Sequence, residues 1–348
     1  ESKRLIEKEA IGVVGCITPW NVPLQINLAK IIPALSAGCS VVLKPAPDTP
    51  WSATLIGAAA NQTDIPDGII NIVPSSDPQS IGEQLVNDPR VDMISFTGST
   101  ATGRTIMSVA ARTVKKVFLE LGGKSANIIL DDADFSQALL SALAVCFHAG
   151  QGCAIQTRLL IPRNRQQEVG EILINYFKMI DYGGKNTDAH IMGPLVNSSQ
   201  RSRVLDYIEK GKAEGARILL GGNAPSHLEK GFYVEPTVFV DVTNDMTIAQ
   251  EEIFGPVLCV IAYKDEQEAV QIANDSIFGL SGGVWSADEA RAIRVARQLR
   301  AGTVNVNGGN FYSADAPFGG YKQSGIGREM GLEGFEEYLE TKTIAIAG

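Results

Sequence analysis

The strongest constraint on the fold of this chain is a regular alternation of short apolar segments with longer amphipathic segments, which starts near Ile11. Short apolar strands that are separated by helices form right-handed βαβ units and a parallel sheet. Ligands of such sheets bind beyond the carboxyl ends of the strands. The first part of the chain is expected to hold strands at 11–17, 39–44, 69–73, 91–96 and 115–121, and helices at 24–36, 51–62, 80–87 and 101–111.

A second alternation follows the glycine pair Gly122 and Gly123, and it predicts a second α/β domain. Its strands are expected at 125–130, 157–162, 257–263, 282–285 and 303–307, and its helices at 135–149, 165–180, 199–214, 266–275 and 287–300. The tail 341–347 alternates like a strand, and the opening segment 3–10 is expected to pair with it or with a neighbouring subunit. The predicted architecture is α/β, with a Rossmann-like parallel-sheet domain at 11–122, a second α/β domain at 123–330, and oligomerisation strands at 1–10 and 338–348.

The composition of the chain limits the partners that it can bind. The formal net charge is −9, which disfavours an extended nucleic-acid interface. No apolar run reaches the roughly 18 residues of a membrane span. The first ten residues are too charged for a signal peptide, and since the chain does not begin with Met, we expect it to start inside a longer polypeptide.

The cysteines and histidines disfavour a disulfide framework and a metal site. The five cysteines form no Cys-x-x-Cys pair, and their odd count fits a reducing, cytoplasmic setting. Those that lie in apolar runs are expected to be buried, namely Cys16, Cys39 and Cys259. No metal is expected, because the three histidines are scattered along the chain at His148, His190 and His227.

The segment FTGSTATGRT (96–105) follows a predicted strand and opens a predicted helix. Gly98 and Gly103 have the spacing of a P-loop, but Arg104 stands where that loop requires lysine, so nucleotide hydrolysis is disfavoured. A helix N-terminus behind glycines can instead hold the pyrophosphate of a dinucleotide. A structural turn is the other interpretation.

Polar side chains follow several other predicted strands. Glu120 ends an apolar run, where it is either an ion-pair partner or a general base. Trp20 and Asn21 follow the first strand, where an asparagine amide can donate to an oxyanion, or where two prolines simply brace a turn. Lys44 ends the second strand, and it either binds ribose or phosphate or is a solvated end residue.

Cys153 lies in HAGQGCAIQTR (148–158), where the neighbours Gly150, Gly152 and Ala154 give its thiol little cover. A thiol that is left accessible in this way is available as a nucleophile. The nearby His148 raises the possibility of a cysteine–histidine pair.

Taken together, these motifs resemble those of the aldehyde dehydrogenase superfamily, in its NAD(P)-dependent, non-acylating form. The resemblance is carried, in family order, by PWN (19–21), KPAPDTP (44–50), FTGSTATG (96–103), LELGGKS (119–125), GQGC (150–153), EEIFGPV (251–257) and PFGGYKQSGIGRE (317–329). It covers nearly the whole chain from Ile11 onward. It implies an oxidoreductase that converts a small-molecule aldehyde to a carboxylic acid through a thiohemiacetal and a thioester on cysteine.

The resemblance also implies a role for each matched residue. Cys153 would be the nucleophile and Glu120 the general base, and Asn21 would share the oxyanion with the Cys153 N–H. His148 would then be structural. The cofactor would be held by Thr18, Trp20, Lys44, Pro47, Gly98, Ser99, Gly103, Leu121, Glu252 and Phe254. The substrate tunnel would include Trp20, Phe311 and Tyr312.

Two departures from the family pattern and two alternatives accompany this hypothesis. NAD-preferring members usually carry glutamate where this chain has Pro47, so NAD is expected with NADP tolerated. The family also carries an N-terminal segment that this chain lacks. The alternatives are a CoA-acylating semialdehyde dehydrogenase, which Glu120 disfavours, and a catalytically idle, truncated relative. A homo-oligomer is expected, either a dimer or a tetramer. Arg158 is expected to face the protein interior, which disfavours a dicarboxylic semialdehyde as substrate.

Overall fold

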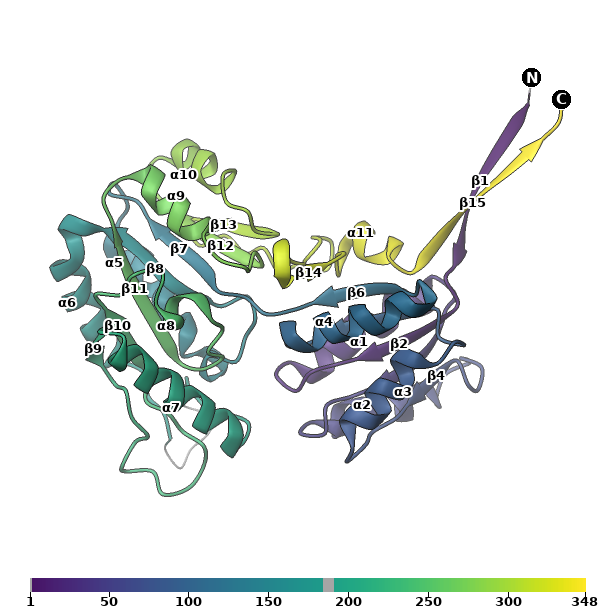
Figure 1. Cartoon of the computed structure of the whole chain (residues 1–348), viewed down its shortest axis with the longest axis horizontal. Coiled ribbons are helices and arrows are strands. Elements are labelled where there is room, and N and C mark those ends of the chain that lie inside the picture. The colour runs from purple at the N-terminus through teal and green to yellow at the C-terminus, as the bar shows by residue number, and fades with distance from the viewer. Residues whose placement is uncertain (1, 184–190) are drawn as a thin grey trace. The chain divides into compact units, whose positions relative to one another are not determined.

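The computed structural model describes residues 2–183 and 191–348, so that His190 lies outside the described residues. The chain divides into two compact units, each with its own sheet (Figure 1). Unit 1 holds Glu1–Leu121, Tyr312–Gly319 and Gly325–Gly348, and unit 2 holds Gly122–Phe311 and Gly320–Ser324. None of the described helices combines the length and the apolar character that crossing a membrane requires.

The main sheet of unit 1 has the strand order β14-β6-β5-β2-β3-β4, and its strands are parallel except for β14. This confirms the parallel sheet predicted from the alternation. The short β14 is not predicted, because two residues of a glycine-rich segment carry no strand pattern. The strands are β2 (Val13–Ile17), β3 (Ser40–Lys44), β4 (Ile70–Ile72), β5 (Met93–Thr97), β6 (Lys116–Glu120) and β14 (Gly325–Ile326).

Helices cover both faces of this sheet. Alternate residues of a strand point to opposite faces, and on β2 Val14 and Cys16 join one core while Val13 and Ile17 pack into the other. The first three helices each begin at a proline, which has no N–H to leave unsatisfied in the first turn. The helices are α1 (Pro23–Ser36), α2 (Pro50–Ala60), α3 (Pro78–Asn87) and α4 (Thr100–Ala110).

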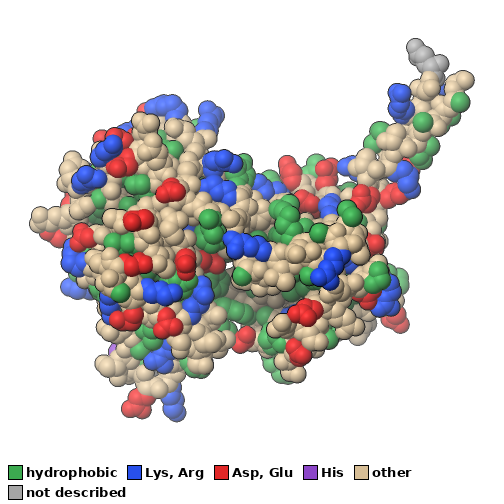
Figure 2. All heavy atoms as spheres, in the orientation of Figure 1, with side chains coloured by type: hydrophobic (Ala, Val, Ile, Leu, Met, Phe, Trp, Pro, Cys, Tyr) green, Lys and Arg blue, Asp and Glu red, His purple; other side chains and the backbone are tan. Residues whose placement is uncertain are grey.

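A separate two-stranded ribbon carries both ends of the chain (Figure 1). β1 (Lys3–Ala10) pairs antiparallel with β15 (Leu339–Ile346), which follows α11 (Gly331–Glu336). The expected pairing of the opening segment with the tail is therefore confirmed. The whole of β1 is exposed, and apolar side chains lie among the charged ones on the ribbon (Figure 2).

The sheet of unit 2 has the order β13-β12-β7-β8-β11-β10-β9, with only the edge strand β9 antiparallel to its neighbour. The predicted second α/β fold is confirmed. β9 and β10 are not predicted, because glycines and prolines interrupt the apolar pattern around them. The strands are β7 (Ser125–Ile129), β8 (Gln156–Pro162), β9 (Arg217–Leu220), β10 (Thr237–Val240), β11 (Val257–Tyr263), β12 (Ser281–Trp285) and β13 (Thr303–Val306).

The predicted helix at 135–149 is wrong. The α-helix ends at Ala138, and 3₁₀ turns follow at 139–145 and 147–150. A helix could not in any case reach residue 149, because His148 and Ala149 take left-handed backbone angles that no α-helix contains. The predicted helix at 287–300 is also too long, since Asp288 caps it and it ends at Ala296. The helices are α5 (Phe135–Ala138), α6 (Gln166–Phe177), α7 (Ser198–Ala213), α8 (Thr247–Gln250), α9 (Glu266–Asn274) and α10 (Glu289–Ala296).

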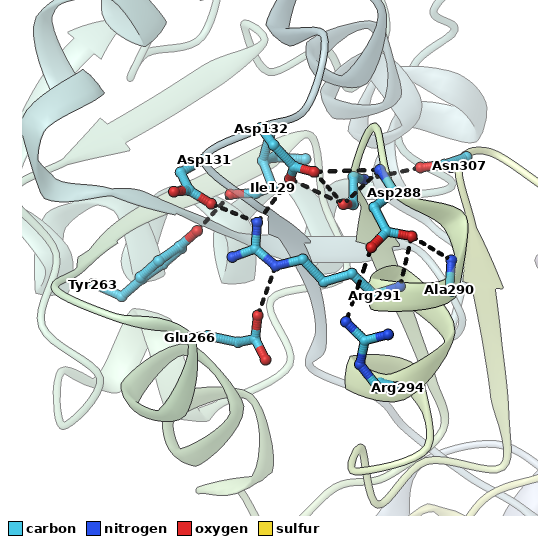
Figure 3. Close-up of polar contacts among 11 residues, drawn as sticks. Ile129, Asp131, Asp132, Tyr263, Glu266, Asp288, Ala290, Arg291, Arg294 and Asn307 are labelled. Atoms are coloured by element: carbon cyan, nitrogen blue, oxygen red, sulfur yellow. Dashed lines mark hydrogen bonds and ion pairs between the residues drawn. The ribbon is translucent and has the colours of Figure 1, made fainter.

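Arg291 ties α9 and α10 to the loop that follows β7 (Figure 3). Its Nη1 lies 2.8 Å from Asp131 and 3.0 Å from Asp132, and its Nε lies 2.9 Å from Glu266. These carboxylates outweigh the desolvation of the guanidinium and raise the pKa of Arg291. One cation shared by several carboxylates fixes three segments of unit 2 together, although single surface ion pairs contribute little.

Candidate active site

Cys153 is the accessible cysteine of the chain. It is half-buried in unit 2, whereas Cys16, Cys39, Cys146 and Cys259 are all buried. This confirms the predicted burial of the three cysteines in apolar runs. Burial raises the pKa of the Cys16 and Cys146 thiols to about 12, which keeps them protonated and unreactive. The sequence expectation that small neighbours leave Cys153 uncovered agrees with its exposure.

The loop before Cys153 is built from unusual backbone. Gly150 has φ +73°, and a Cβ at this position would lie 2.0 Å from the carbonyl oxygen of Gly255. The buried side chain of Gln151 donates to the His148 carbonyl at 2.9 Å and accepts from the Val196 N–H at 2.9 Å. The loop is therefore held by backbone contacts on both sides. The side chain of His148 is exposed, and the residue supports the loop through its carbonyl.

Gly122 and Gly123 have no side chains, so the Glu252 carboxylate and the Cys153 carbonyl oxygen can lie close to their backbone. The Gly123 N–H donates to Glu252 Oε1 at 2.9 Å. A Cβ on Gly122 would lie 2.5 Å from Glu252 Oε2, and a Cβ on Gly123 would lie 2.4 Å from the Cys153 carbonyl oxygen. Gly122 thus lies against the Glu252 carboxylate, and its neighbour Gly123 lies against the backbone of Cys153.

The carboxyl group of Glu252 titrates near neutrality. Burial raises its pKa from 4.5 to about 7, against the opposing effects of the Gly123 N–H, Lys124 and Arg203. Phe254, two residues further on, is half-buried and has φ +64°. A left-handed backbone at a bulky residue is uncommon and often marks a functional turn. Both residues belong to unit 2, as does Cys153.

Arg158 faces the interior of unit 2, as expected. It is 1% exposed, and its guanidinium donates to three carbonyl groups and one side-chain amide oxygen. With these donors satisfied by the protein, Arg158 is not available to bind a substrate carboxylate. The acceptors are the carbonyls of Lys124, Ile272 and Ala273 and the side chain of Asn244.

A groove of about 590 Å³ lies in unit 1 at the carboxyl ends of the strands. It brings together five of the expected cofactor residues, which are Thr18, Trp20, Lys44, Pro47 and Gly98. Lys44 is buried, its Nζ donates to the Pro45 carbonyl at 3.1 Å, and burial lowers its pKa. Within the described residues, Lys44 and Glu83 are the charged groups that line the groove.

The N-terminus of α4 opens beside this groove. The Ser99 hydroxyl caps the helix by accepting from the Thr102 N–H at 3.2 Å. A Cβ on Gly98 would lie 2.5 Å from the Phe96 ring, and a Cβ on Gly103 would lie 2.5 Å from Leu121. The glycines therefore let the turn and the helix pack closely on the sheet, and the positive end of the α4 dipole lies at the edge of the groove, where it favours an anion.

Glu120 and Asn21 also belong to unit 1. Glu120 ends β6, where it pairs with Thr97 of β5 and Gly325 of β14, and it is 2% exposed. Asn21 is buried in the segment between β2 and α1. Both side chains are therefore buried at the carboxyl ends of parallel strands, where ligands of such sheets bind. This position agrees with the expected roles of Glu120 as general base and Asn21 as oxyanion donor.

The expected substrate residues are divided between the units. Tyr312, in unit 1, accepts a hydrogen bond from Gln25 Nε2 at 2.5 Å, and its ring meets Phe318 edge-on with 5.6 Å between centroids. Trp20 is half-buried in the same unit, and Phe311 is half-buried in unit 2. Gln25 and Phe318 are therefore additional candidates that the motif matches did not single out.

The sequence model of the aldehyde dehydrogenase family matches residues 1–344. The chain belongs to the aldehyde dehydrogenase family. One curated aldehyde dehydrogenase relative is 3-succinoylsemialdehyde-pyridine dehydrogenase of a Pseudomonas species. It is 47% identical over 341 residues, which cover 97% of this chain and 71% of the relative.

Solved aldehyde dehydrogenases share the same fold. A mutant of aldehyde dehydrogenase C from Pseudomonas syringae, in complex with NAD+ and octanal, matches with a TM-score of 0.95 and 46% identity, covering 98% of this chain and 70% of that chain. An aldehyde dehydrogenase of Mycobacterium tuberculosis, in complex with NAD+, matches with a TM-score of 0.96 and 45% identity, covering 99% and 71%. The family resemblance inferred from the motifs is confirmed.

Some residues around the site carry no sequence signal of their own. A supporting role for Gln151 could have been predicted, because a polar residue between two glycines needs hydrogen-bond partners when its loop is packed. Lys124 lies inside the LELGGKS motif, but its burial follows from the strand that it precedes. The support that Val196 gives to Gln151 comes from a distant loop, and no local pattern could have indicated it.

Proposed function

We propose that this chain oxidises an aldehyde to a carboxylic acid with NAD, and that Cys153 is the nucleophile. The observation that carries the proposal is the contrast among the cysteines, since only Cys153 is accessible and its loop is braced by Gly150 and Gln151. Family membership and the NAD+ complexes of two solved relatives support the same reaction.

The residues of unit 1 suit the adenosine and pyrophosphate of a dinucleotide. The groove has room for such a ligand, and the hydroxyls of Thr18 and Thr97, which line it, find no hydrogen-bond partner among the described residues. The N-terminal end of α4, which Ser99 caps, carries the positive end of the helix dipole and favours the negative charge of phosphate oxygens. Lys44 offers a cation and a donor to ribose hydroxyls. NAD, when bound, accepts the hydride that leaves the substrate carbon.

Cys153 begins the reaction as a thiolate. Its sulfur forms a bond to the aldehyde carbon, and the carbonyl oxygen becomes an alkoxide. The family resemblance implies that Asn21 Nδ2 and the Cys153 N–H would donate to this oxygen. When the alkoxide re-forms a carbonyl, the carbon loses a hydride and becomes a thioester of Cys153. In the roles that the family resemblance implies, Glu252 would hold ribose hydroxyls of the cofactor and Phe254 would lie beside its nicotinamide end.

Glu120 completes the turnover. Its carboxylate accepts a proton from water as the water oxygen attacks the thioester carbon. The carbon–sulfur bond then breaks, the carboxylic acid leaves, the Cys153 thiolate is restored, and Glu120 releases the proton to solvent. The family resemblance makes Trp20, Phe311 and Tyr312 the candidates for contact with the substrate, and Gln25 supplies a polar group next to Tyr312.

The exposed ribbon of β1 and β15 supports a homo-oligomer. An exposed strand edge with apolar side chains is a template for pairing with another chain. We therefore infer that this ribbon joins subunits. The thiol nucleophile fits a reducing compartment, and we infer that the enzyme acts in the cytoplasm.

The test of the proposed function measures NADH formation with a panel of aldehydes. The panel includes straight-chain aldehydes, aromatic aldehydes and a semialdehyde, each with NAD or NADP and with or without CoA. Acid and NADH formed in equal amounts without CoA are expected. NADH formation that depends on CoA would make the chain an acylating enzyme, and no NADH with any aldehyde would contradict the proposal.

A further inference from the structure

Three amide side chains of unit 2 converge over one glycine of its sheet. Gly283 lies on β12, where its register partners are Asn127 of β7 and Asn305 of β13. Gln156 begins β8, the next strand beyond β7 (Figure 1). A Cβ on Gly283 would have three side-chain oxygens as its nearest atoms, at 2.6 Å from Asn305 and at 2.7 Å from Asn127 and Gln156. The three oxygens therefore face a common point above Gly283.

The hydrogen bonds around these amides fix the direction of two of them. The Ser141 hydroxyl donates to the Ala138 carbonyl, which uses its single hydrogen. Ser141 can therefore only accept from Asn127, whose Nδ2 lies 2.7 Å from the hydroxyl oxygen. Gln156 Nε2 donates to Asn305 Oδ1 at 3.2 Å. The oxygens of Asn127 and Gln156, and not their nitrogens, are consequently turned toward the common point.

Asn127 Oδ1 is the atom of this group that most needs a partner. Asn127 is 1% exposed, and its Oδ1 has no hydrogen-bond partner among the described residues. Buried side-chain oxygens in proteins are nearly always satisfied, because an unpaired one loses its hydration without compensation. Asn305 and Gln156 are half-buried, so this group of amides is not sealed from solvent. A small solute that accepts no hydrogen bond and attracts oxygens would satisfy Asn127.

We propose that the amide oxygens of Asn127, Gln156 and Asn305 bind a monovalent cation, such as potassium, over Gly283. Carbonyl oxygens are the ligands that replace the hydration shell of potassium in its selective channels. Magnesium and calcium sites are built with carboxylates, and none of the three converging groups is a carboxylate. A water molecule has two hydrogens, so it could donate to only two of the three oxygens.

The bound ion joins three strands of unit 2 at one row of the sheet. It holds Asn127 of β7, Gln156 of β8 and Asn305 of β13 together across the glycine of β12. Gln156 stands at the point where the loop that carries Cys153 enters β8. Ser281, also on β12, already donates from Oγ to the Ala154 carbonyl of this loop at 2.7 Å. The ion thus adds a second attachment between the loop and the sheet.

The first experiment measures urea unfolding of the unsubstituted chain in about 0.2 M potassium chloride or choline chloride, which have the same ionic strength. Choline is a monovalent cation too large for the site. An ion that binds only the folded chain lowers the unfolding equilibrium constant by the factor 1 + [K⁺]/Kd, which is about ten-fold for a Kd of about 20 mM. Potassium is expected to stabilise the chain by roughly this factor. Equal stability in the two salts would overturn the proposal.

Substitutions on β12 then place the effect. Gly283→Ala should abolish the potassium dependence, because its Cβ would lie among the three oxygens. Gly282→Ala is the matched control, because its Cβ points to the other face of the sheet and meets the flexible end of Leu299 at 3.2 Å. Gln156→Met removes one oxygen at the half-buried side and should weaken the dependence, even if Gly283→Ala does not fold. A potassium effect that survives unchanged in these site variants would overturn the proposal.

Crystals grown in rubidium chloride locate the ion directly, because rubidium scatters anomalously and has the charge of potassium. An anomalous peak in contact with Asn127 Oδ1 is expected. A bound water only, or no density at this place, would overturn the proposal. None of these measurements uses a cofactor or catalysis, so their outcome is independent of the proposed function.

Discussion

The α-carbon of Gly150 packs directly against the carbonyl oxygen of Gly255, since a Cβ on Gly150 would lie 2.0 Å from that oxygen. Gly150→Ala should therefore displace the loop that carries Cys153. We expect a loss of at least about 2 kcal/mol in the free energy of unfolding and a large loss of kcat. Gly152→Ala is the control, because its Cβ would meet only the flexible end of Ile155. Equal losses in the free energy of unfolding for the two variants would contradict the inference that the Gly255 carbonyl holds the loop at Gly150.

Cys153→Ala should abolish aldehyde oxidation, because no other thiol of the chain is accessible. NADH binding should stay within a few-fold of the unsubstituted chain, since the thiol is needed for chemistry and not for holding the cofactor. The measurement is turnover alongside a fluorescence titration with NADH. Cys146→Ala serves as the matched control at a buried cysteine. Turnover that survives in Cys153→Ala would assign the nucleophile to another residue.

Glu120→Gln should separate the two halves of the reaction. Hydride transfer precedes the attack of water, so the variant should release one equivalent of NADH per site in a rapid burst and then stall by a factor of about 10²–10⁴. Stopped-flow absorbance of NADH reads both phases. Absence of the burst would mean that Glu120 acts before hydride transfer or is needed to hold the end of β6.

Pro47→Glu should sharpen the preference for NAD over NADP. Pro47 lines the groove with Lys44, and it offers no carboxylate to accept from a ribose hydroxyl or to repel a 2′-phosphate. One charge-assisted hydrogen bond is worth roughly 1.5–3 kcal/mol, or about one to two decades in affinity. The measurement is the ratio of kcat/KM for the two cofactors.

Glu83 provides the control for this prediction, because it is the carboxylate that already lines the groove. If the unsubstituted chain rejects NADP strongly and Glu83→Gln relaxes that rejection, then Glu83 and not position 47 determines the choice of cofactor. The prediction for Pro47 would then be wrong.

Glu252→Gln should stabilise the chain at alkaline pH and not at acid pH. Burial raises the pKa of Glu252 from 4.5 to about 7, so the folded chain binds a proton more tightly than the unfolded chain. The stability from this group is full below pH 4.5 and is lost as the pH rises through 7. Glutamine keeps an acceptor for the Gly123 N–H and carries no charge. We expect a gain of about 2–3 kcal/mol in urea unfolding at pH 8 and little change near pH 4.5. An equal effect at both pH values would contradict the raised pKa.

The sequence predicts the sheets well and the loops around the site poorly, and the reason is physical. The parallel strands follow from apolar runs between helical patterns, and those runs must be apolar because both faces of the sheet are covered. The segment 135–149 also has the pattern of a helix, but its α-helix stops at Ala138, and His148 and Ala149 take left-handed angles. The contact between Gly150 and the carbonyl oxygen of Gly255 cannot be predicted from local propensity, because the two residues are far apart in the sequence.

The candidate site residues likewise fall into those that a local sequence pattern locates and those that depend on distant contacts. Lys44, Ser99 and Glu120 can be located as candidates from the sequence, because each lies at the end of a predicted strand or within three residues of it. Residues that act through distant partners cannot be located in this way. Gln151 binds Val196 and Gln25 binds Tyr312, and such pairings depend on how the whole unit folds.

Because we propose that the ribbon of β1 and β15 joins subunits, its order is expected to depend on protein concentration. Two strands by themselves are marginally stable in water, and this ribbon exposes Ile6 at 63% and Ile346 at 44%. Its backbone hydrogen bonds should therefore be protected only while another surface covers it. Dilution should speed amide hydrogen exchange in the ribbon while the strands of the two main sheets exchange at unchanged rates. The ends of the chain would then report on self-association without any label.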